Sequence, residues 1–157
     1  RKALDKKEKE IYTRDCGMKI DLLNLNWIYR AKKYYHMLPP DIYLMTIPIH
    51  YRIKVDEFKA RVEAPTVDQF IQLLANTYYE NRFHAMQRSE GMEQFYKACI
   101  HGMYLSDRRR NPYSLATVNT YLFLKEEEIN RLTTALECIR YGLTPRETLG
   151  YIGGAKK

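Results

Sequence analysis

Glycine is scarce in this chain of 157 residues, and its scarcity excludes the common nucleotide-binding loops. Only seven glycines occur, and four of them lie within the last sixteen positions. Phosphate-binding loops need closely spaced glycines, in patterns such as G-x-x-x-x-G-K-[ST] and G-x-G-x-x-G, so that backbone N–H groups can reach the phosphates. Neither pattern occurs. We therefore expect no nucleotide site, no cofactor and no small-molecule substrate.

Cysteine is also scarce. The three cysteines are Cys16, Cys99 and Cys138. Their odd number and wide spacing argue against a disulfide framework and for a reducing compartment. Neither they nor the four histidines show a zinc-binding or catalytic spacing. The sequence therefore predicts no metal site and no catalytic residues.

Long apolar runs are absent as well. The longest nearly apolar stretch, 42–49, is interrupted by Thr46 and Pro48, and a membrane-spanning helix needs roughly 20 apolar residues. The chain opens on Arg1, and eight of its first ten residues are charged, unlike a signal peptide. We expect a soluble chain that forms part of a longer protein.

The charge of the chain raises a nucleic-acid hypothesis. With 26 basic and 19 acidic residues the net charge is +7, and 14 tyrosines are present. Cations neutralise phosphates and aromatic rings stack on bases, so a basic helical nucleic-acid-binding module is the alternative function. The basic residues are dispersed, however, and in the first fourteen positions they are mixed with acidic ones, which is typical of a solvated helix face. We therefore favour a protein that does not bind nucleic acid.

The densest basic cluster is Arg108, Arg109 and Arg110, directly before Asn111-Pro112. A cation at the C-terminus of a helix stabilises it by about 0.3–1 kcal/mol through its interaction with the helix macrodipole. This gives the cluster a structural explanation. Binding of a partner protein is the other interpretation of the same residues.

Helical periodicity between Gly and Pro breakers predicts an all-α fold. Thr66 with Gln69, and Thr144 with Glu147, are capping boxes, and Gly142 suits a left-handed helix stop. Two sub-units, 1–64 and 65–157, are a possible division. The predicted helices are 1–14, 19–37, 40–46, 55–62, 67–78, 82–109, 113–141 and 145–152.

Projection of 19–37 onto a helical wheel gives one apolar arc with an amide inside it. The arc contains Ile20, Leu23, Trp27, Ala31, Tyr34 and Tyr35. Asn26 and Arg30 fall opposite. Asn24 lies within the arc, and a buried amide without hydrogen bonds costs about 1–3 kcal/mol, so we expect Asn24 to clamp a specific neighbour.

The helix at 113–141 carries a sustained heptad pattern. Its members are Val118, Leu122, Lys125, Ile129, Leu132, Leu136 and Ile139. A lysine on a packed seam either extends its ammonium group to the surface or pairs with a carboxylate, for which Glu128 and Asp21 are candidates. We expect Lys125 and Asn24 to lie at a helix–helix contact.

Two stretches resemble a known family. Residues 21–32 read DLLNLNWIYRAK and 121–130 read YLFLKEEEIN, followed by YGLTP at 141–145. They are similar to the patterns D-x-x-N-[LI]-K-x-[LI]-x-R-x-K and Y-x-x-x-K-E-x-E-[IV]-x-N-[LI] of the C subunit of V/A-type ATPases, the counterpart of V-ATPase subunit d. Departures are Asn26 in place of Lys, Arg131 before Leu132, and 46–50 in place of a P-G-G turn.

The resemblance covers most of the chain and corresponds to the C-terminal half of that family. It implies structural roles for the polar motif residues Asp21, Asn24, Arg30, Lys32, Lys125, Glu126, Glu128 and Asn130. It also implies a funnel of similar helical repeats, in keeping with a faint echo of 21–40 in 127–145. The implied function is that of a noncatalytic central-stalk subunit, which couples the shaft subunits to the proteolipid rotor ring for proton or sodium transport. Such a subunit is peripheral, on the cytoplasmic face of the membrane.

Overall fold

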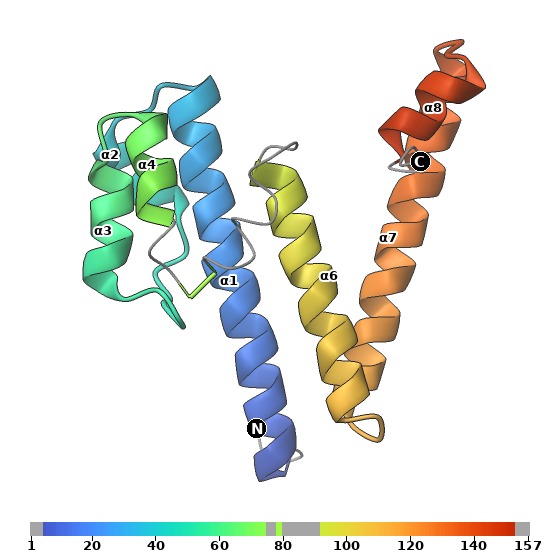
Figure 1. Cartoon of the computed structure of the whole chain (residues 1–157), viewed down its shortest axis with the longest axis horizontal. Coiled ribbons are helices and arrows are strands. Elements are labelled where there is room, and N and C mark those ends of the chain that lie inside the picture. Colours follow the sequence, from blue (N-terminus) through green and yellow to red (C-terminus); the bar gives the residue numbers. More distant parts are fainter. Residues whose placement is uncertain (1–4, 75–77, 80–91, 153–157) are drawn as a thin grey trace.

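The regular elements of the chain are α-helices (Figure 1). The structure is a computed structural model, and it describes residues 5–74, 78–79 and 92–152. Within these ranges every regular element is helical, so the predicted all-α class is confirmed. The elements are α1 (Lys6–Tyr34), α2 (Pro39–Met45), α3 (Val55–Glu63), α4 (Val67–Leu74), α6 (Met92–Arg110), α7 (Leu115–Arg140) and α8 (Pro145–Tyr151).

The long helix α1 is the centre of the arrangement. Figure 1 shows α2, α3 and α4 on one side of its C-terminal half, and α6 with α7 on the other side. α6 and α7 form an antiparallel pair that is closest near its connecting turn, and α8 folds back against α7. α1 therefore packs against both groups of helices, which a strictly one-faced amphipathic helix cannot do.

The buried stripe of α1 differs from the predicted arc. Its members are spaced alternately by four and three residues: Ile11, Asp15, Met18, Leu22, Leu25 and Tyr29. The predicted arc was wrong, because Tyr34 and Tyr35 are 60% and 65% exposed while Asn26, placed opposite, is buried. Packing on two sides widens the buried surface of the helix beyond one apolar arc.

The predicted break between the helices 1–14 and 19–37 is also wrong, because α1 continues through Gly17. A Cβ atom at position 17 would lie 2.4 Å from Cγ of Tyr51, which is far closer than two carbon atoms can approach. Gly17 is therefore the place where the segment between α2 and α3 rests directly on the backbone of α1.

The helix ends follow their predicted signals. Thr144 and Glu147 make a reciprocal capping box ahead of Pro145, and Gly142 has φ of +71°. At Thr66 the hydroxyl oxygen accepts a hydrogen bond from Gln69 N at 3.2 Å. The predicted 82–109 helix is observed from Met92 onward, and its first ten residues lie outside the described ranges.

The heptad pattern of α7 is present but is not packed as predicted. Its six large apolar side chains are each between 51% and 67% exposed. The buried residues of α7 are Ala116, Thr120 and Cys138, on the opposite side of the helix. Among the described helices, none is long and apolar enough to cross a membrane.

Replacement of Gly17 by alanine tests the close approach of Tyr51. Alanine favours a helix by up to about 1 kcal/mol over glycine, but here its methyl group must displace Tyr51, and such overpacking costs about 1–3 kcal/mol. We expect Gly17→Ala to lower the midpoint of thermal unfolding by several degrees, measured by circular dichroism. Gly150→Ala is the matched control, since no atom lies within 4 Å of its added Cβ, and it should not lower the midpoint. Equal midpoints for Gly17→Ala and the wild type would contradict the contact.

Candidate functional site

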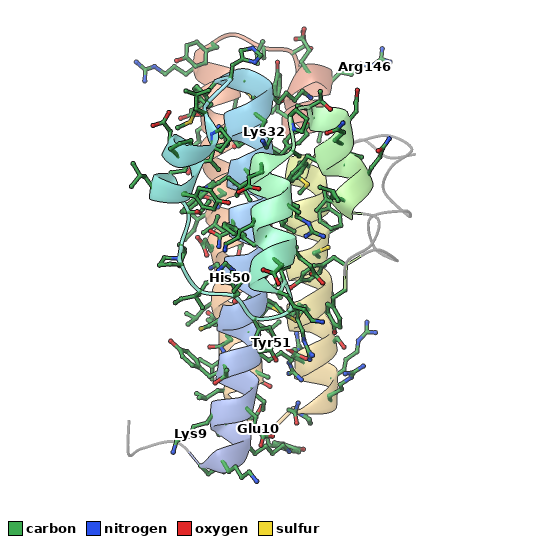
Figure 2. The ribbon with its side chains drawn as sticks, turned by 90° about the vertical axis from the view of Figure 1, so that its left-hand side faces the viewer. Lys9, Glu10, Lys32, His50, Tyr51 and Arg146 are labelled. Carbon is green, nitrogen blue, oxygen red and sulfur yellow. The ribbon has the colours of Figure 1, made fainter. Side chains whose placement is uncertain are left out.

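Three polar residues of the first sequence motif lie on one face of α1. Asp21, Asn24 and Lys32 are three and eight residues apart, spacings that bring them onto the side facing α2, α3 and α4. Each side chain bonds to backbone groups of the chain between residues 47 and 64. Figure 2 views the molecule from this side, with Lys32 near the upper end of α1 and Tyr51 lower down. We call these three residues the α1 clamp.

Asp21 binds the loop that precedes α3. Its Oδ1 accepts a hydrogen bond from Tyr51 N at 3.0 Å, and its Oδ2 accepts from Arg52 N at 2.7 Å and from Ile53 N at 3.3 Å. Tyr79 also donates its hydroxyl to Oδ2 at 3.4 Å. A carboxylate that is only 2% exposed is stabilised by such a set of donors, since hydrogen bonds to a charged acceptor are the stronger ones. Burial, and then the charge of Asp21, raises the pKa of Tyr79, which therefore stays a donor.

Asn24 binds both backbone groups of Ile47. Its Nδ2 donates to Ile47 O at 2.8 Å, and its Oδ1 accepts from Ile47 N at 2.9 Å. Asn24 is 1% exposed, so the amide has the specific neighbour that a buried amide requires. The neighbour is the segment after α2, not a second helix.

Lys32 binds the end of α3. Its Nζ donates to Val62 O and to Ala64 O, each at 2.6 Å. These carbonyl groups close a helix, where partial negative charge accumulates, so an ammonium group is favoured there. Partial burial lowers the pKa of Lys32. Arg30, the fourth motif residue, lies on the opposite, exposed face of α1.

The second motif lies on the exposed surface of α7. Lys125 Nζ donates to Glu128 Oε2 at 2.6 Å, and this hydrogen bond raises the pKa of Lys125. Glu126 and Asn130 are exposed. Within the described chain the expected helix contact through Lys125 is not formed, because the side chain is 50% exposed and pairs with Glu128 of the same helix. The structure therefore does not bring the two motifs together.

Arg108, Arg109 and Arg110 form the last turn of α6 and are exposed. This is the position at which cations complement a helix macrodipole. Their binding of a partner protein remains a prediction.

A buried polar cluster at the junction of α1, α6 and α7 is not among the predicted site residues. Arg14 Nη2 lies 2.8 Å from Asp107 Oδ1, and Asn119 Nδ2 donates to Asp15 Oδ2 at 3.3 Å. One oxygen of each acid, Asp15 Oδ1 and Asp107 Oδ2, is buried without a hydrogen-bond donor in the described part of the chain. Asp15 and Asp107 therefore share a single nearby cation, Arg14.

Burial, and then the neighbouring acid Asp107, raises the pKa of Asp15 to about 7. The charge of Asp15 contributes, after burial, to raising the pKa of Tyr104 on α6 to about 12. The sequence signal for this cluster is Asp15 itself, which occupies one position of the buried α1 stripe. The predicted helices 1–14 and 19–37 leave Asp15 out, so this signal appears only when one helix is assumed to continue through Gly17.

Arg61 is a second buried charge outside the predicted set. It is 2% exposed, and it donates to Glu57 O within α3 and to Leu73 O of α4 at 2.7 Å. Burial lowers the pKa of Arg61. Arg61 thus joins α3 to α4 in the way that the α1 clamp joins α1 to α3.

No catalytic arrangement emerges from the described residues. They contain no group of three or more His, Cys, Asp or Glu side chains that could hold a metal ion. Glu127 pairs with Arg131 at 3.4 Å on the surface of α7, as expected for an i,i+4 pair. The polar residues that the structure brings together join helices to one another or to the segment between α2 and α3.

The chain matches a known protein family. A family model described as ATP synthase (C/AC39) subunit matches residues 1–151. No curated protein and no solved structure matches the chain.

Replacement of Asn24 by alanine should leave Ile47 N and O without partners. A buried unsatisfied group costs about 1–3 kcal/mol, so we expect Asn24→Ala to lower the free energy of unfolding by that amount in urea titrations. Asn130→Ala, which changes an exposed amide on α7, is the matched control and should have little effect. Equal effects of the two variants would rule out the clamp.

The Asp15 cluster predicts an unusual pH dependence. The pKa of Asp15 is about 7 in the folded chain and about 3.9 in an unfolded one. Between these values the folded state binds more protons, so stability contributed by Asp15 is fully present below about pH 4 and is lost as pH rises to about 7. Asn mimics the protonated acid, so Asp15→Asn should gain stability relative to wild type over this window, by on the order of 1–3 kcal/mol at pH 8.

The measurement is urea unfolding of both proteins from pH 4 to pH 8, with the exposed Asp41→Asn as control. The difference between Asp41→Asn and wild type should stay nearly constant. If the Asp15→Asn difference is equally flat, Asp15 does not hold a proton in the folded chain.

Proposed function

Because the chain belongs to the ATP synthase (C/AC39) subunit family, we propose that it is a noncatalytic central-stalk subunit of a rotary V/A-type ATPase. In this role it links the rotating shaft subunits to the membrane proteolipid ring, and torque passes through it between ATP hydrolysis and ion transport. It is held at the cytoplasmic face of the membrane through the ring. The observation that carries the proposal is the family match over residues 1–151.

The construction of the molecule supports a mechanical role. A part that transmits torque must not let its helices slide past one another. Apolar contacts are non-directional and permit sliding, whereas hydrogen bonds have fixed geometry. The α1 clamp and Arg61 place directional bonds between α1, α3, α4 and the loop before α3. These bonds hold the elements in one register.

The acidic run of α7 supports a noncatalytic role. Glu128 pairs with Lys125 on an exposed face of α7, and the half-buried Glu127 pairs with Arg131. An ion pair with a neighbouring cation on the same helix explains each carboxylate without a catalytic role.

The experiment uses the assembled ATPase in membrane vesicles. Complexes that lack the subunit should lose ATP-driven ion transport, and addition of the subunit should restore it. Complexes with Asn24→Ala should transport fewer ions per ATP hydrolysed than the wild type, because a loosened body transmits torque poorly, whereas Asn130→Ala should keep the wild-type ratio. Ion uptake and phosphate release are measured in the same vesicles.

Two results would overturn the proposal. One is full ion transport by complexes that lack the subunit. The other is tight nucleic-acid binding by the purified chain near physiological salt, since scattered surface cations give only weak binding that is lost as salt rises.

A further inference from the structure

Three separate segments of the chain meet around one recess in the surface. We call it the α1 recess, and the residues that line it include Lys6, Lys7, Lys9, Glu10, Arg52 and Asn111. Figure 2 shows Lys9 and Glu10 at the lower end of α1 and Tyr51, the neighbour of Arg52, above them. The volume of the recess is about 620 Å³, which is within the range of ligand-binding sites.

The α1 recess is positively charged. Lys6, Lys7, Lys9 and Arg52 are all exposed, and none of them forms an ion pair within the described residues. Glu10 is the one acid among the described residues of the lining. The lining therefore carries an excess of cations that the described fold does not use.

The acids next to the recess are engaged elsewhere. Asp5 accepts a hydrogen bond from Glu8 N at 2.8 Å and caps α1, and Glu8 Oε2 accepts one from Leu115 N at 3.0 Å. Asp107 Oδ1 lies 2.8 Å from Arg14 Nη2. Each of these carboxylates holds a group of the fold, so the cations of the recess are left for a partner.

Arg52 is held in place by two aromatic rings. Its guanidinium carbon lies 5.0 Å from the ring centroid of Tyr51 and 4.9 Å from that of Tyr78. Asp21 fixes the backbone N–H groups of Tyr51 and Arg52. A stacked guanidinium keeps the N–H groups at its edge available, and its planar fork matches a carboxylate through two parallel hydrogen bonds. Arg52 is thus positioned in advance to receive an anion.

We propose that the α1 recess binds an acidic segment of a partner protein. Arg52 receives one carboxylate, and Lys6, Lys7 and Lys9 attract further carboxylates. The lining follows α1 from Lys6 to Arg14, which is about 12 Å at 1.5 Å per residue. A segment of about four extended residues spans this length.

The exposed arginines at the end of α6 extend the positive charge. Arg108, Arg109 and Arg110 directly precede Asn111, which lines the recess. A longer acidic segment would meet them as it leaves the recess.

The form of the recess favours a protein segment over other polyanions. A nucleic-acid backbone carries a charge at every nucleotide and would bring phosphates near Glu10, whereas a peptide can place an uncharged residue there. The rings of Tyr51 and Tyr78 already contact Arg52, so they are not available as a platform for bases. A membrane surface is flat, and the recess is concave.

The inference does not rest on the proposed function. It concerns the charge and shape of one surface, and the binding assay below uses the purified chain without the ATPase. A failure of this assay leaves the proposed function untouched, and the reverse holds as well.

The test is fluorescence anisotropy of a labelled deca-glutamate peptide, titrated with the purified chain at physiological salt. The wild type should bind it saturably, and deca-glutamine should not bind. Arg52→Gln should weaken binding at least about tenfold, because it removes a charge-assisted pair of hydrogen bonds. Arg146→Gln, at an exposed position of α8 near the upper end of Figure 2, removes the same charge and is the matched control. It should change the affinity less than about twofold, since its charge is distant and screened.

A second variant tests the recess by a gain of affinity, which damage to the fold cannot produce. Glu10→Gln removes the one carboxylate of the described lining, so deca-glutamate should bind about threefold more tightly or better. Asp41→Asn, which removes an exposed carboxylate of α2, is the control and should leave the affinity nearly unchanged.

Equal effects of Arg52→Gln and Arg146→Gln would overturn the proposal, because binding would then follow net charge and not the recess. Two further probes are single-stranded DNA of ten nucleotides and vesicles that contain phosphatidylserine. If either binds more tightly than deca-glutamate and loses its binding through Arg52→Gln, the recess serves nucleic acid or a membrane and the proposal is wrong.

Discussion

The irregular backbone between α2 and α3 imposes the main constraint on this fold. Its N–H and C=O groups have no neighbouring strand to bond with, and buried backbone groups without partners are costly. Helix α1 supplies the partners from its side chains: Asn24 for Ile47, and Asp21 for residues 51–53. Tyr51 of this loop packs directly on the backbone of α1 at Gly17, where the helix has no side chain. The positions of α3 and α4 depend on these contacts together with the bonds from Lys32 to the end of α3.

α1 therefore has two different buried surfaces. Toward α3 and α4 it presents polar side chains that bond to backbone. Toward α6 and α7 it presents Arg14, which pairs with Asp107, and Asp15, which accepts a hydrogen bond from Asn119. This combination suits a body that keeps its shape under load. The proposed role rests on the family match, and the hydrogen bonds supply a physical reason why this chain suits that role.

The helix ends and the all-α class could be predicted from the sequence because helix caps and hydrophobic periodicity depend on nearby residues. The roles of Thr144 and Gly142 at helix ends follow from their sequence neighbours alone. Gly17 could not be interpreted in the same way, since its reason is Tyr51, 34 positions later in the sequence. The heptad pattern of α7 was also visible in the sequence. Periodicity indicates only that one face of a helix is apolar, however, and does not identify what covers that face. A buried Asn24 indicated that its amide has a hydrogen-bond partner. Only the structure identifies that partner as the backbone of Ile47.

Because of the cluster of Arg14, Asp15 and Asp107, the folded chain binds a proton that the unfolded chain does not hold. Two buried acids share one cation, so between about pH 4 and pH 7 unfolding releases the proton of Asp15 to the solvent. The heat of unfolding in that range then includes the protonation of the buffer. Unfolding enthalpies of this protein are therefore comparable only between buffers with equal heats of ionisation. In two buffers with different heats of ionisation, the difference between the measured unfolding enthalpies gives the number of protons released.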